Sequence, residues 1–378
     1  MPFGPCVRIM PPMPSHLVSP PTSPHLTSPD APPSFDPDAA AGAESGLYGL
    51  PFDPEAAHVV VLPVPFEATT SFRPGTAQGP EAMLAASRQV DLFDGELGRI
   101  YAPGIALLEG SEDVVRWNAE ARALAEPIIE AGGAGDDPAL QSALSQVNTL
   151  SAQVNAWVRA QAEYWLSRDK LVVVLGGDHS VPLGSIAAHA ARYPELGVLH
   201  LDAHADLRVA YEGFTYSHAS IMHNVCQEIS GVTRLVQVGV RDFGEREGRF
   251  IEDSGGRVLT FFDAALQRRK LMGETWHHLC HEIVAPLPEH VYLSWDIDGL
   301  DPTLCPNTGT PVPGGLSYAE ACHLLRVVVE SGRRIVGLDL VEVAPAARGE
   351  SNEGWDANVG ARLLYKMIGW ALRSSGRI

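Results

Sequence analysis

Three short runs of this 378-residue chain carry His and Asp at the spacing of metal ligands. They are residues 176–180 (GGDHS), 202–206 (DAHAD) and 294–302 (SWDIDGLDP). Two divalent cations held about 3.5–4 Å apart can share one hydroxide and make it a nucleophile at neutral pH. The runs therefore predict a two-metal hydrolase, with six ligands: His179, Asp202, His204, Asp206, Asp296 and Asp298.

The types of these ligands narrow the choice of metal. Carboxylate oxygen and imidazole nitrogen suit Mn²⁺, Fe²⁺, Co²⁺, Ni²⁺ or Zn²⁺, and none of the runs contains a Cys that would indicate a thiolate site. Asp202, His204 and Asp206 alternate along a segment that we expect to be extended, so their side chains should point the same way. One short run could then contact both cations.

Each run follows a short apolar segment, which is typical of a strand buried on both faces. Such strands are predicted at residues 59–62, 171–175, 198–202, 235–240, 258–261, 291–296 and 335–341. Helical segments separate them, at residues 81–87, 113–131, 141–166, 183–192, 219–229, 276–283, 318–330 and 359–373. This alternation predicts a single three-layer α/β/α domain with a doubly wound, mostly parallel sheet.

The predicted strands also place the ligands. In an open α/β sheet, ligands bind just beyond the carboxyl ends of the strands. His179, Asp202 and Asp296 each stand at or just after the end of a predicted strand. We therefore expect the three runs to meet at one edge of the sheet.

The first 45 residues differ from the rest of the chain. They are rich in Pro, Ser, Thr and Ala and lack hydrophobic periodicity. Such a segment buries too little apolar surface to offset its ordering entropy. We predict a disordered tail over residues 1–45 and one catalytic domain over residues 46–378.

Composition excludes several classes of partner. The formal net charge is −19 and the longest basic cluster is residues 268–270, so nucleic acid is not expected, because phosphate binding needs clustered Lys and Arg. No apolar run approaches the about 20 residues of a membrane span, and the N-terminus lacks the apolar core of a secretory signal. Five scattered Cys residues without a CxxC pair fit a cytoplasmic protein.

The three runs resemble the signatures of the ureohydrolase family, which includes arginase and agmatinase. Residues 71–76 (SFRPGT) with Gly79 and Pro80, and residues 308–316 (TGTPVPGGL), resemble motifs of the agmatinase branch. The similarity covers about residues 55 to 372. It implies an arginase-like fold, two divalent cations (Mn²⁺ first, Ni²⁺ as the alternative) and a homo-oligomer, either a trimer or a hexamer.

The resemblance also divides the ligands, which their spacing alone does not. One cation would be held by His179, Asp202, Asp206 and Asp296. The other would be held by Asp202, His204, Asp296 and Asp298, so that Asp202 and Asp296 bridge the two.

Catalytic roles follow from the same resemblance. His218 would be an exposed proton shuttle with a pKa near roughly 6.5. Glu342 would pair with the guanidinium group of the substrate, because carboxylate and guanidinium match as a bidentate pair. Asp298 would help to stabilise the tetrahedral intermediate, and Trp355 is a candidate substrate contact that could instead open the last helix.

Two further acids and a Ser flank the ligands. Asp178 and Asp301 are expected either to support a metal-bound His or to cap a turn. Ser180 is expected to cap the helix that follows it.

The resemblance implies attack on the central carbon of a guanidino group, with urea and an amine as products. Residues 208–216 replace the Ser-Gly-Asn segment with which arginase grips its amino acid head group, which disfavours arginine. Residues 218–220 (HAS), 343–345 (VAP) and 348–351 (RGES) depart from the agmatinase pattern. We predict an agmatinase-like substrate. The alternatives are free guanidine, a guanidino acid of the guanidinobutyrate or guanidinopropionate type, and a formimino compound.

Two other function classes are alternatives to this one. A non-catalytic family member would act by binding or assembly, and the presence of all six ligands with His218 and Glu342 speaks against it. A binuclear hydrolase of phosphoesters or amides is the other class, and no basic phosphate pocket accompanies the motifs.

Overall fold

The computed structural model describes residues 35–346 and 352–378. Most of the predicted tail, residues 1–34, and the RGES segment lie outside the described residues. Residues 35–45, which the sequence assigned to the same tail, include turns, and Phe35 packs edge-on against Tyr101 with ring centroids 6.2 Å apart. Contacts with the domain therefore begin before the boundary expected at residue 46.

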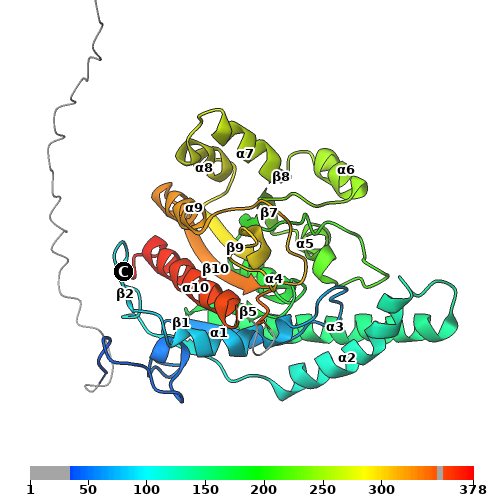
Figure 1. Ribbon diagram of the computed structural model, residues 1–378, viewed down its shortest axis with the longest axis horizontal. Coiled ribbons are helices and arrows are strands. Elements are labelled where there is room, and N and C mark those ends of the chain that lie inside the picture. Colours follow the sequence, from blue (N-terminus) through cyan, green and yellow to red (C-terminus); the bar gives the residue numbers. More distant parts are fainter. Residues whose placement is uncertain (1–34, 347–351) are drawn as a thin grey trace, which may run out of the picture.

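A parallel sheet of eight strands forms the centre of the domain (Figure 1). The strand order is β4-β1-β5-β10-β9-β6-β7-β8, and every pairing is parallel. A separate antiparallel hairpin joins β2 (Phe93–Asp94) to β3 (Gly98–Arg99). The strands of the large sheet are β1 (Val59–Val64), β4 (Ile105–Leu107), β5 (Leu171–Gly176), β6 (Leu196–Leu201), β7 (Val232–Val238), β8 (Val258–Phe261), β9 (His290–Asp296) and β10 (Arg334–Val341).

The central strands are apolar along their length because both faces of the sheet are covered. Every residue of β1 and β6 is buried. Pro63 interrupts β1 without breaking it, because β4 pairs only with residues 59–61 and no β4 residue lies opposite Pro63.

Helices cover the two faces of the sheet as separate layers (Figure 1). One layer contains α1 (Gly79–Ser87), α7 (Asp263–Leu271), α8 (Trp276–Val284), α9 (Tyr318–Glu330) and α10 (Trp355–Ser374). The other contains α2 (Glu112–Glu130), α3 (Pro138–Leu166), α4 (Leu183–Arg192), α5 (Ile221–Glu228) and α6 (Glu245–Asp253). Short 3-10 turns are η1 (Leu47–Gly49), η2 (Thr76–Gln78), η3 (His218–Ser220) and η4 (Ile297–Gly299).

The predicted α/β/α domain with a doubly wound parallel sheet is confirmed, and each predicted strand and helix is present with small shifts at its ends. The prediction missed β4, the β2–β3 hairpin, α6 and α7. The strand β4 has only three residues, and α6 (EREGRFIED) and α7 (DAALQRRKL) contain few apolar residues to mark a period. In the described ranges, no helix combines the length and apolarity needed to cross a bilayer.

Candidate metal centre

The three motifs meet at the carboxyl end of the sheet, as expected. His179 follows β5, Asp202 follows β6 and Asp296 ends β9. In the sheet, β9 lies beside β6, and β10 lies between β9 and β5. The turn η4 starts directly after Asp296 and carries Asp298, whose N–H donates to Asp296 Oδ1 at 2.8 Å. Neighbouring strand ends thus bring together side chains more than 100 positions apart in the chain.

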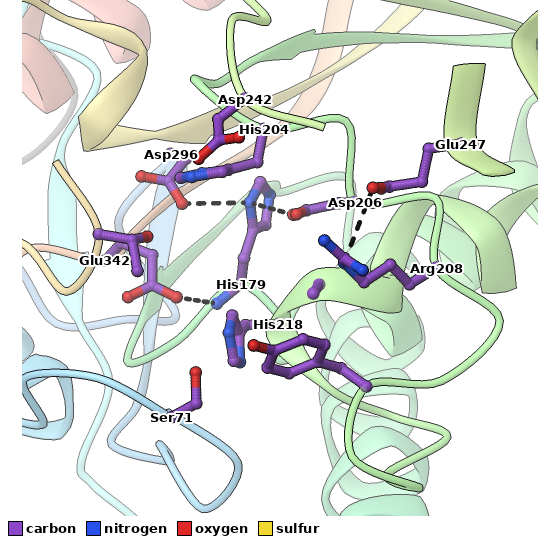
Figure 2. Close-up of a pocket in the computed structure, with 13 residues that line it drawn as sticks. Ser71, His179, His204, Asp206, Arg208, His218, Asp242, Glu247, Asp296 and Glu342 are labelled. Carbon is purple, nitrogen blue, oxygen red and sulfur yellow. Dashed lines mark hydrogen bonds and ion pairs between the residues drawn. The ribbon is translucent and has the colours of Figure 1, made fainter. Parts of the chain in front are cut away.

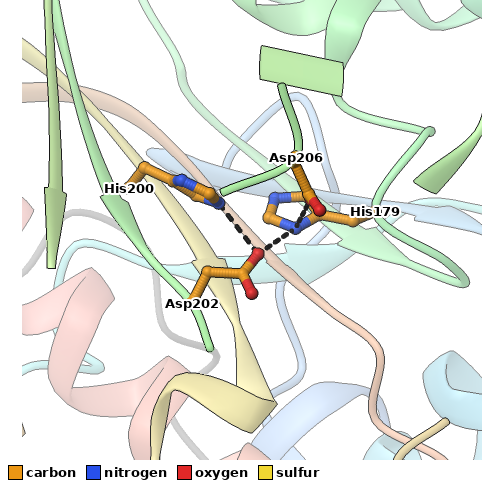
Figure 3. A group of neighbouring side chains, drawn as sticks. All are labelled: His179, His200, Asp202 and Asp206. Carbon is orange, nitrogen blue, oxygen red and sulfur yellow. Dashed lines mark hydrogen bonds and ion pairs between the residues drawn. The ribbon is translucent and has the colours of Figure 1, made fainter. Parts of the chain in front are cut away.

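The ring of His179 is the centre of a first group of donors. Its Nδ1 lies 3.0 Å from Asp202 Oδ2, 3.3 Å from Asp206 Oδ2 and 3.5 Å from Asp296 Oδ2. All four side chains are buried, and Figure 3 shows the ring between Asp202 and Asp206. These four residues are the set that the family resemblance assigned to one cation.

A second group forms around His204. Its Nδ1 lies 3.1 Å from Asp298 Oδ2 and 3.4 Å from Asp202 Oδ1. Asp202 therefore turns one oxygen toward each group, which is the geometry of a bridging carboxylate. The distances join Asp296 to the first group, and its bridging role stays a prediction.

The buried acids of both groups fit cations. Burial and the carboxylate of Asp202 raise the pKa of Asp206 to about 7, and burial with Asp298 and Asp202 raises the pKa of Asp296 well above its usual range. Burial opposes the charged form of His179, but the adjacent carboxylates raise the pKa of this imidazole well above its usual range. Concentrating acids at a buried site is costly unless positive charge compensates them, and oxygen and imidazole donors suit Mn²⁺ or Ni²⁺.

The ligand segment 202–206 is not extended throughout, so the expected simple alternation is wrong. Asp206 has a φ of 53°, in the left-handed region that residues with a Cβ rarely adopt. Its carbonyl accepts the N–H groups of Met222 and His223 at 3.0 and 3.1 Å. The first turn of α5 therefore holds the bend that aims Asp206 at His179.

A pocket with a cavity volume of about 170 Å³ lies beside the two groups (Figure 2). Four of the predicted ligands line it, together with His218 and Glu342. The sequence did not single out the remaining lining residues, although Ser71, Arg208 and Thr310 stand in segments compared with the family. The full set of these additional residues is Ser71, Arg208, Tyr211, Ala219, Asp242, Glu247 and Thr310.

Glu342 reaches this pocket from the residue after β10. Its backbone is also left-handed, with a φ of 62°, and its N–H donates to the carbonyl of Gly177 at 2.8 Å. Glu342 Oε1 accepts the N–H of His179 at 2.9 Å, whereas no donor among the described residues reaches Oε2. Burial and the carboxylate of Asp178 raise the pKa of Glu342 well above its usual range. One oxygen of this acid is thus free for a ligand.

His218 begins η3 and lines the pocket next to Tyr211, with ring centroids 5.9 Å apart. Its Nδ1 faces the hydroxyl of Thr69 at 3.5 Å. Burial, then the positive charges of His204 and His179, lower the pKa of His218 to about 4. The expectation of an exposed His with an ordinary pKa is wrong, because the side chain is half-buried at the pocket wall and its surroundings lower the pKa.

Trp355 is not among the residues that line this pocket. It begins α10 with 44% of its surface exposed, and its Nε1 donates to the carbonyl of Thr303 at 3.0 Å. The alternative, that it opens the last helix, matches its position. The next residue, Asp356, accepts the backbone N–H and the Nδ2 of Asn307, both at 2.8 Å.

The flanking residues cap turns. Asp301 accepts the N–H of Thr303 at 2.9 Å, and Asp178 accepts the N–H and the hydroxyl of Ser180 at 2.9 and 2.5 Å. The expectation that Ser180 caps the following helix is wrong, because its hydroxyl donates to Asp178 and Pro182 occupies the N-cap of α4.

His200 is a buried residue of the site that the sequence analysis missed. It lies on β6, and its Nε2 is 2.9 Å from Asp202 Oδ2 (Figure 3). The signal was present, because residues i and i+2 of a strand share a face. A further acidic group lies on the surface and consists of Glu274, His278 and Glu282. Both of its carboxylates already pair with Arg269, at 2.5 and 2.7 Å, so part of its charge is compensated.

The sequence matches the model of the Arginase family over residues 57–369. The chain belongs to the arginase family. It is 36% identical over 315 residues to the N(1)-aminopropylagmatine ureohydrolase of Thermus thermophilus. That alignment covers 83% of this chain and 90% of the relative. It is 30% identical over 323 residues to the proclavaminate amidinohydrolase of Streptomyces clavuligerus, in an alignment that covers 84% of this chain and 91% of that protein.

Solved structures share the fold. The agmatine ureohydrolase of Thermoplasma volcanium superposes with a TM-score of 0.65 at 23% identity, covering 86% of this chain and 94% of that one. The predicted arginase-like fold and family resemblance are confirmed. Family membership also confirms the predicted class of reaction, which is hydrolysis of the C–N bonds of guanidino compounds with release of urea.

Proposed function

We propose that this arginase-family protein is a binuclear metal hydrolase that converts an agmatine-type guanidino compound into urea and an amine. One observation carries the proposal: two His–Asp groups share Asp202 beside a pocket into which Glu342 offers a free oxygen. Similarity to a relative named for N(1)-aminopropylagmatine supports the substrate class.

The site would hold two divalent cations, Mn²⁺ by our first choice and Ni²⁺ as the alternative. The distances support His179, Asp202 and Asp206 at one cation and His204, Asp202 and Asp298 at the other. Asp296 would serve both. When bound, the two cations would supply the activated nucleophile and would stabilise the tetrahedral intermediate that forms when it adds to the guanidinium carbon.

Glu342 would bind and orient the guanidinium group. A planar guanidinium presents parallel N–H donors that match a carboxylate. Because the backbone N–H of His179 holds Oε1, the carboxylate has a fixed orientation, and Oε2 would accept a hydrogen bond from the substrate. The positive charge of the substrate would also favour the ionised form of this buried acid.

His218 would move the proton that the leaving amine needs. Thr69 lies on the Nδ1 side of the ring, which leaves Nε2 for exchange with the pocket. A neutral imidazole can accept a proton there and then donate it to the departing nitrogen. Asp298, held by the N–H of Ala203 at 3.0 Å, would help to stabilise the tetrahedral intermediate.

A guanidino acid is the second candidate substrate, because Arg208 lines the pocket. Its Nε lies 3.7 Å from Glu247 Oε2, but Glu247 already accepts two backbone N–H groups, from Leu207 and Gly244, at 2.9 and 2.7 Å. Arg208 could therefore turn to a substrate carboxylate. Asp242 lines the same pocket and would instead favour a substrate with an amine tail.

Urea release tests the substrate assignment. The purified protein, loaded separately with Mn²⁺ and Ni²⁺, would be offered agmatine, N(1)-aminopropylagmatine, guanidinobutyrate, guanidinopropionate, arginine and guanidine. We expect kcat/KM to be highest for an agmatine-type compound. A guanidino acid turned over fastest would favour the Arg208 alternative, and an absence of urea from every compound would contradict the proposal.

We also propose that the protein works in the cytoplasm as a homo-oligomer of three or six chains. Four of its Cys residues, Cys226, Cys280, Cys305 and Cys322, carry free thiols, which suits a reducing compartment. The oligomer rests on the family resemblance alone. Light scattering coupled to gel filtration would measure the mass, and a monomer would contradict this part of the proposal.

A further inference from the structure

We propose that Gln237 and His200 form a positioning pair that fixes Asp202 and the backbone of the ligand segment, and that His200 is not itself a metal ligand. This inference rests on the proposed two-metal site. Proximity alone leaves His200 ambiguous, because His179, His200, Asp202 and Asp206 together could surround a cation. The hydrogen bonds of Gln237 remove that ambiguity.

The amide of Gln237 has a fixed orientation. Its nitrogen Nε2 lies 2.7 Å from the carbonyl oxygen of Ala205, and a carbonyl oxygen can only accept a hydrogen bond. Its oxygen Oε1 accepts the hydroxyl of Thr260 at 2.9 Å. The carbonyl of Ala205 requires this orientation of the amide, and the hydroxyl of Thr260 is compatible with it. The second amide hydrogen therefore points to the remaining neighbour.

That neighbour is Nδ1 of His200, 3.0 Å from Gln237 Nε2. Because the amide nitrogen donates, Nδ1 must present a lone pair, and the neutral ring carries its proton on Nε2. Nε2 then donates to Asp202 Oδ2 at 2.9 Å. Neither ring nitrogen has a lone pair left for a cation. His200 therefore orients the proposed ligand Asp202 and does not itself bind a cation.

The sheet itself sets this alignment. His200, Gln237 and Thr260 are direct cross-strand partners on β6, β7 and β8. His200 and Gln237 are fully buried, so water does not compete for these bonds. A row of three side chains therefore runs from the edge of the sheet to Asp202.

The same amide also supports the second half of the ligand segment. Ala205, whose carbonyl it binds, directly precedes Asp206 and its left-handed backbone. Gln237 thus connects Asp202, through His200, with the bend that aims Asp206 at His179. Losing this amide would loosen two ligands of one cation at once.

Metal affinity provides the test, measured by Mn²⁺ titration of the metal-free protein against a chelator. Gln237→Leu and His200→Leu should each weaken the binding of one of two Mn²⁺ ions by about tenfold or more, as expected for groups that orient metal ligands. His200→Gln keeps an N–H donor for Asp202 and should recover part of the loss. Thr260→Val, the matched control, removes only the far contact and should change affinity least.

Two results would overturn the inference. Wild-type affinity for both ions in folded Gln237→Leu and His200→Leu would remove the positioning role. Loss of one ion in His200→Leu with full affinity in Gln237→Leu would make His200 a ligand. If the Leu variants do not fold, Gln237→Glu decides by the same criterion, because its carboxylate keeps the volume of the amide but cannot donate to Ala205 or His200. Since no step depends on turnover, a failed urea assay would contradict the proposed substrate without touching this result.

Discussion

The backbone N–H of His179 donates to Glu342 Oε1 at 2.9 Å, so the residue at the centre of the first donor group also orients the acid of the pocket. Only one carboxylate oxygen is used in this contact. The proposed metal site and the proposed substrate site are therefore linked through a main-chain hydrogen bond, but they depend on different side-chain atoms and should be separable by mutation.

Glu342→Gln should retain both cations and lose urea release by about 100-fold or more, because a neutral amide cannot form the charge-assisted hydrogen bond that the free Oε2 offers to guanidinium. Metal content and steady-state kinetics would be measured on the same sample. The exposed Glu252 offers a control, as Glu252→Gln removes an acid that does not line the pocket. Normal kcat and KM in Glu342→Gln would remove the proposed role.

Asp202→Asn and Asp296→Asn should lose metal and turnover together. Asp202 faces both His179 and His204, so a neutral side chain there weakens both groups at once. Elemental analysis after dialysis would give the number of cations per chain. Wild-type activity in either variant would show that the ligand assignment is wrong.

His218→Asn should keep both cations and lower kcat by about 100-fold to 10,000-fold, the usual contribution of a positioned acid or base. Its side-chain contacts among the described residues are with Thr69 and Tyr211, so the substitution leaves the hydrogen bonds of the donor groups in place. A variant with unchanged kcat would exclude proton transfer by His218.

The sequence grouped the six candidate ligands because each stands at or shortly after a strand end, where hydrophobic runs and polar residues meet, and the structure brings them together. It missed His200, although a residue two positions before Asp202 on the same strand shares its face. The contact of His200 with Gln237 depends on the alignment of β6, β7 and β8 and could not be predicted. The bend at Asp206 depends on α5, and the lowered pKa of His218 depends first on burial and then on His204 and His179. These are long-range effects that no local pattern contains. Trp355 follows a segment outside the described residues. The sequence around it did not indicate whether its side chain would line the pocket or stand at the start of the last helix.

Stability should fall with acid through His189, a buried residue of α4 whose Nδ1 donates to the carbonyl of Ser185 at 2.7 Å. Burial lowers the pKa of His189 from 6.5 to about 4 in the folded protein. The unfolded chain therefore binds this proton more tightly. The contribution of neutral His189 to the free energy of unfolding is complete above pH 6.5. It is lost as the pH falls toward 4, and the loss amounts to at most about 3 kcal/mol.

His189→Gln should reduce that pH dependence. Thermal unfolding of both metal-free proteins at about pH 7.5 and about pH 5 would measure it. The wild type should lose more stability than the variant between the two conditions. Equal losses would mean that His189 is not responsible.

The most direct test of the account is a titration of metal-free protein with Mn²⁺, following urea release from the guanidino compound that it hydrolyses fastest. Two donor groups that share Asp202 predict activity that rises until two cations are bound per chain and then stays constant. Full activity with one cation, or urea release that does not depend on metal, would contradict the two-metal account.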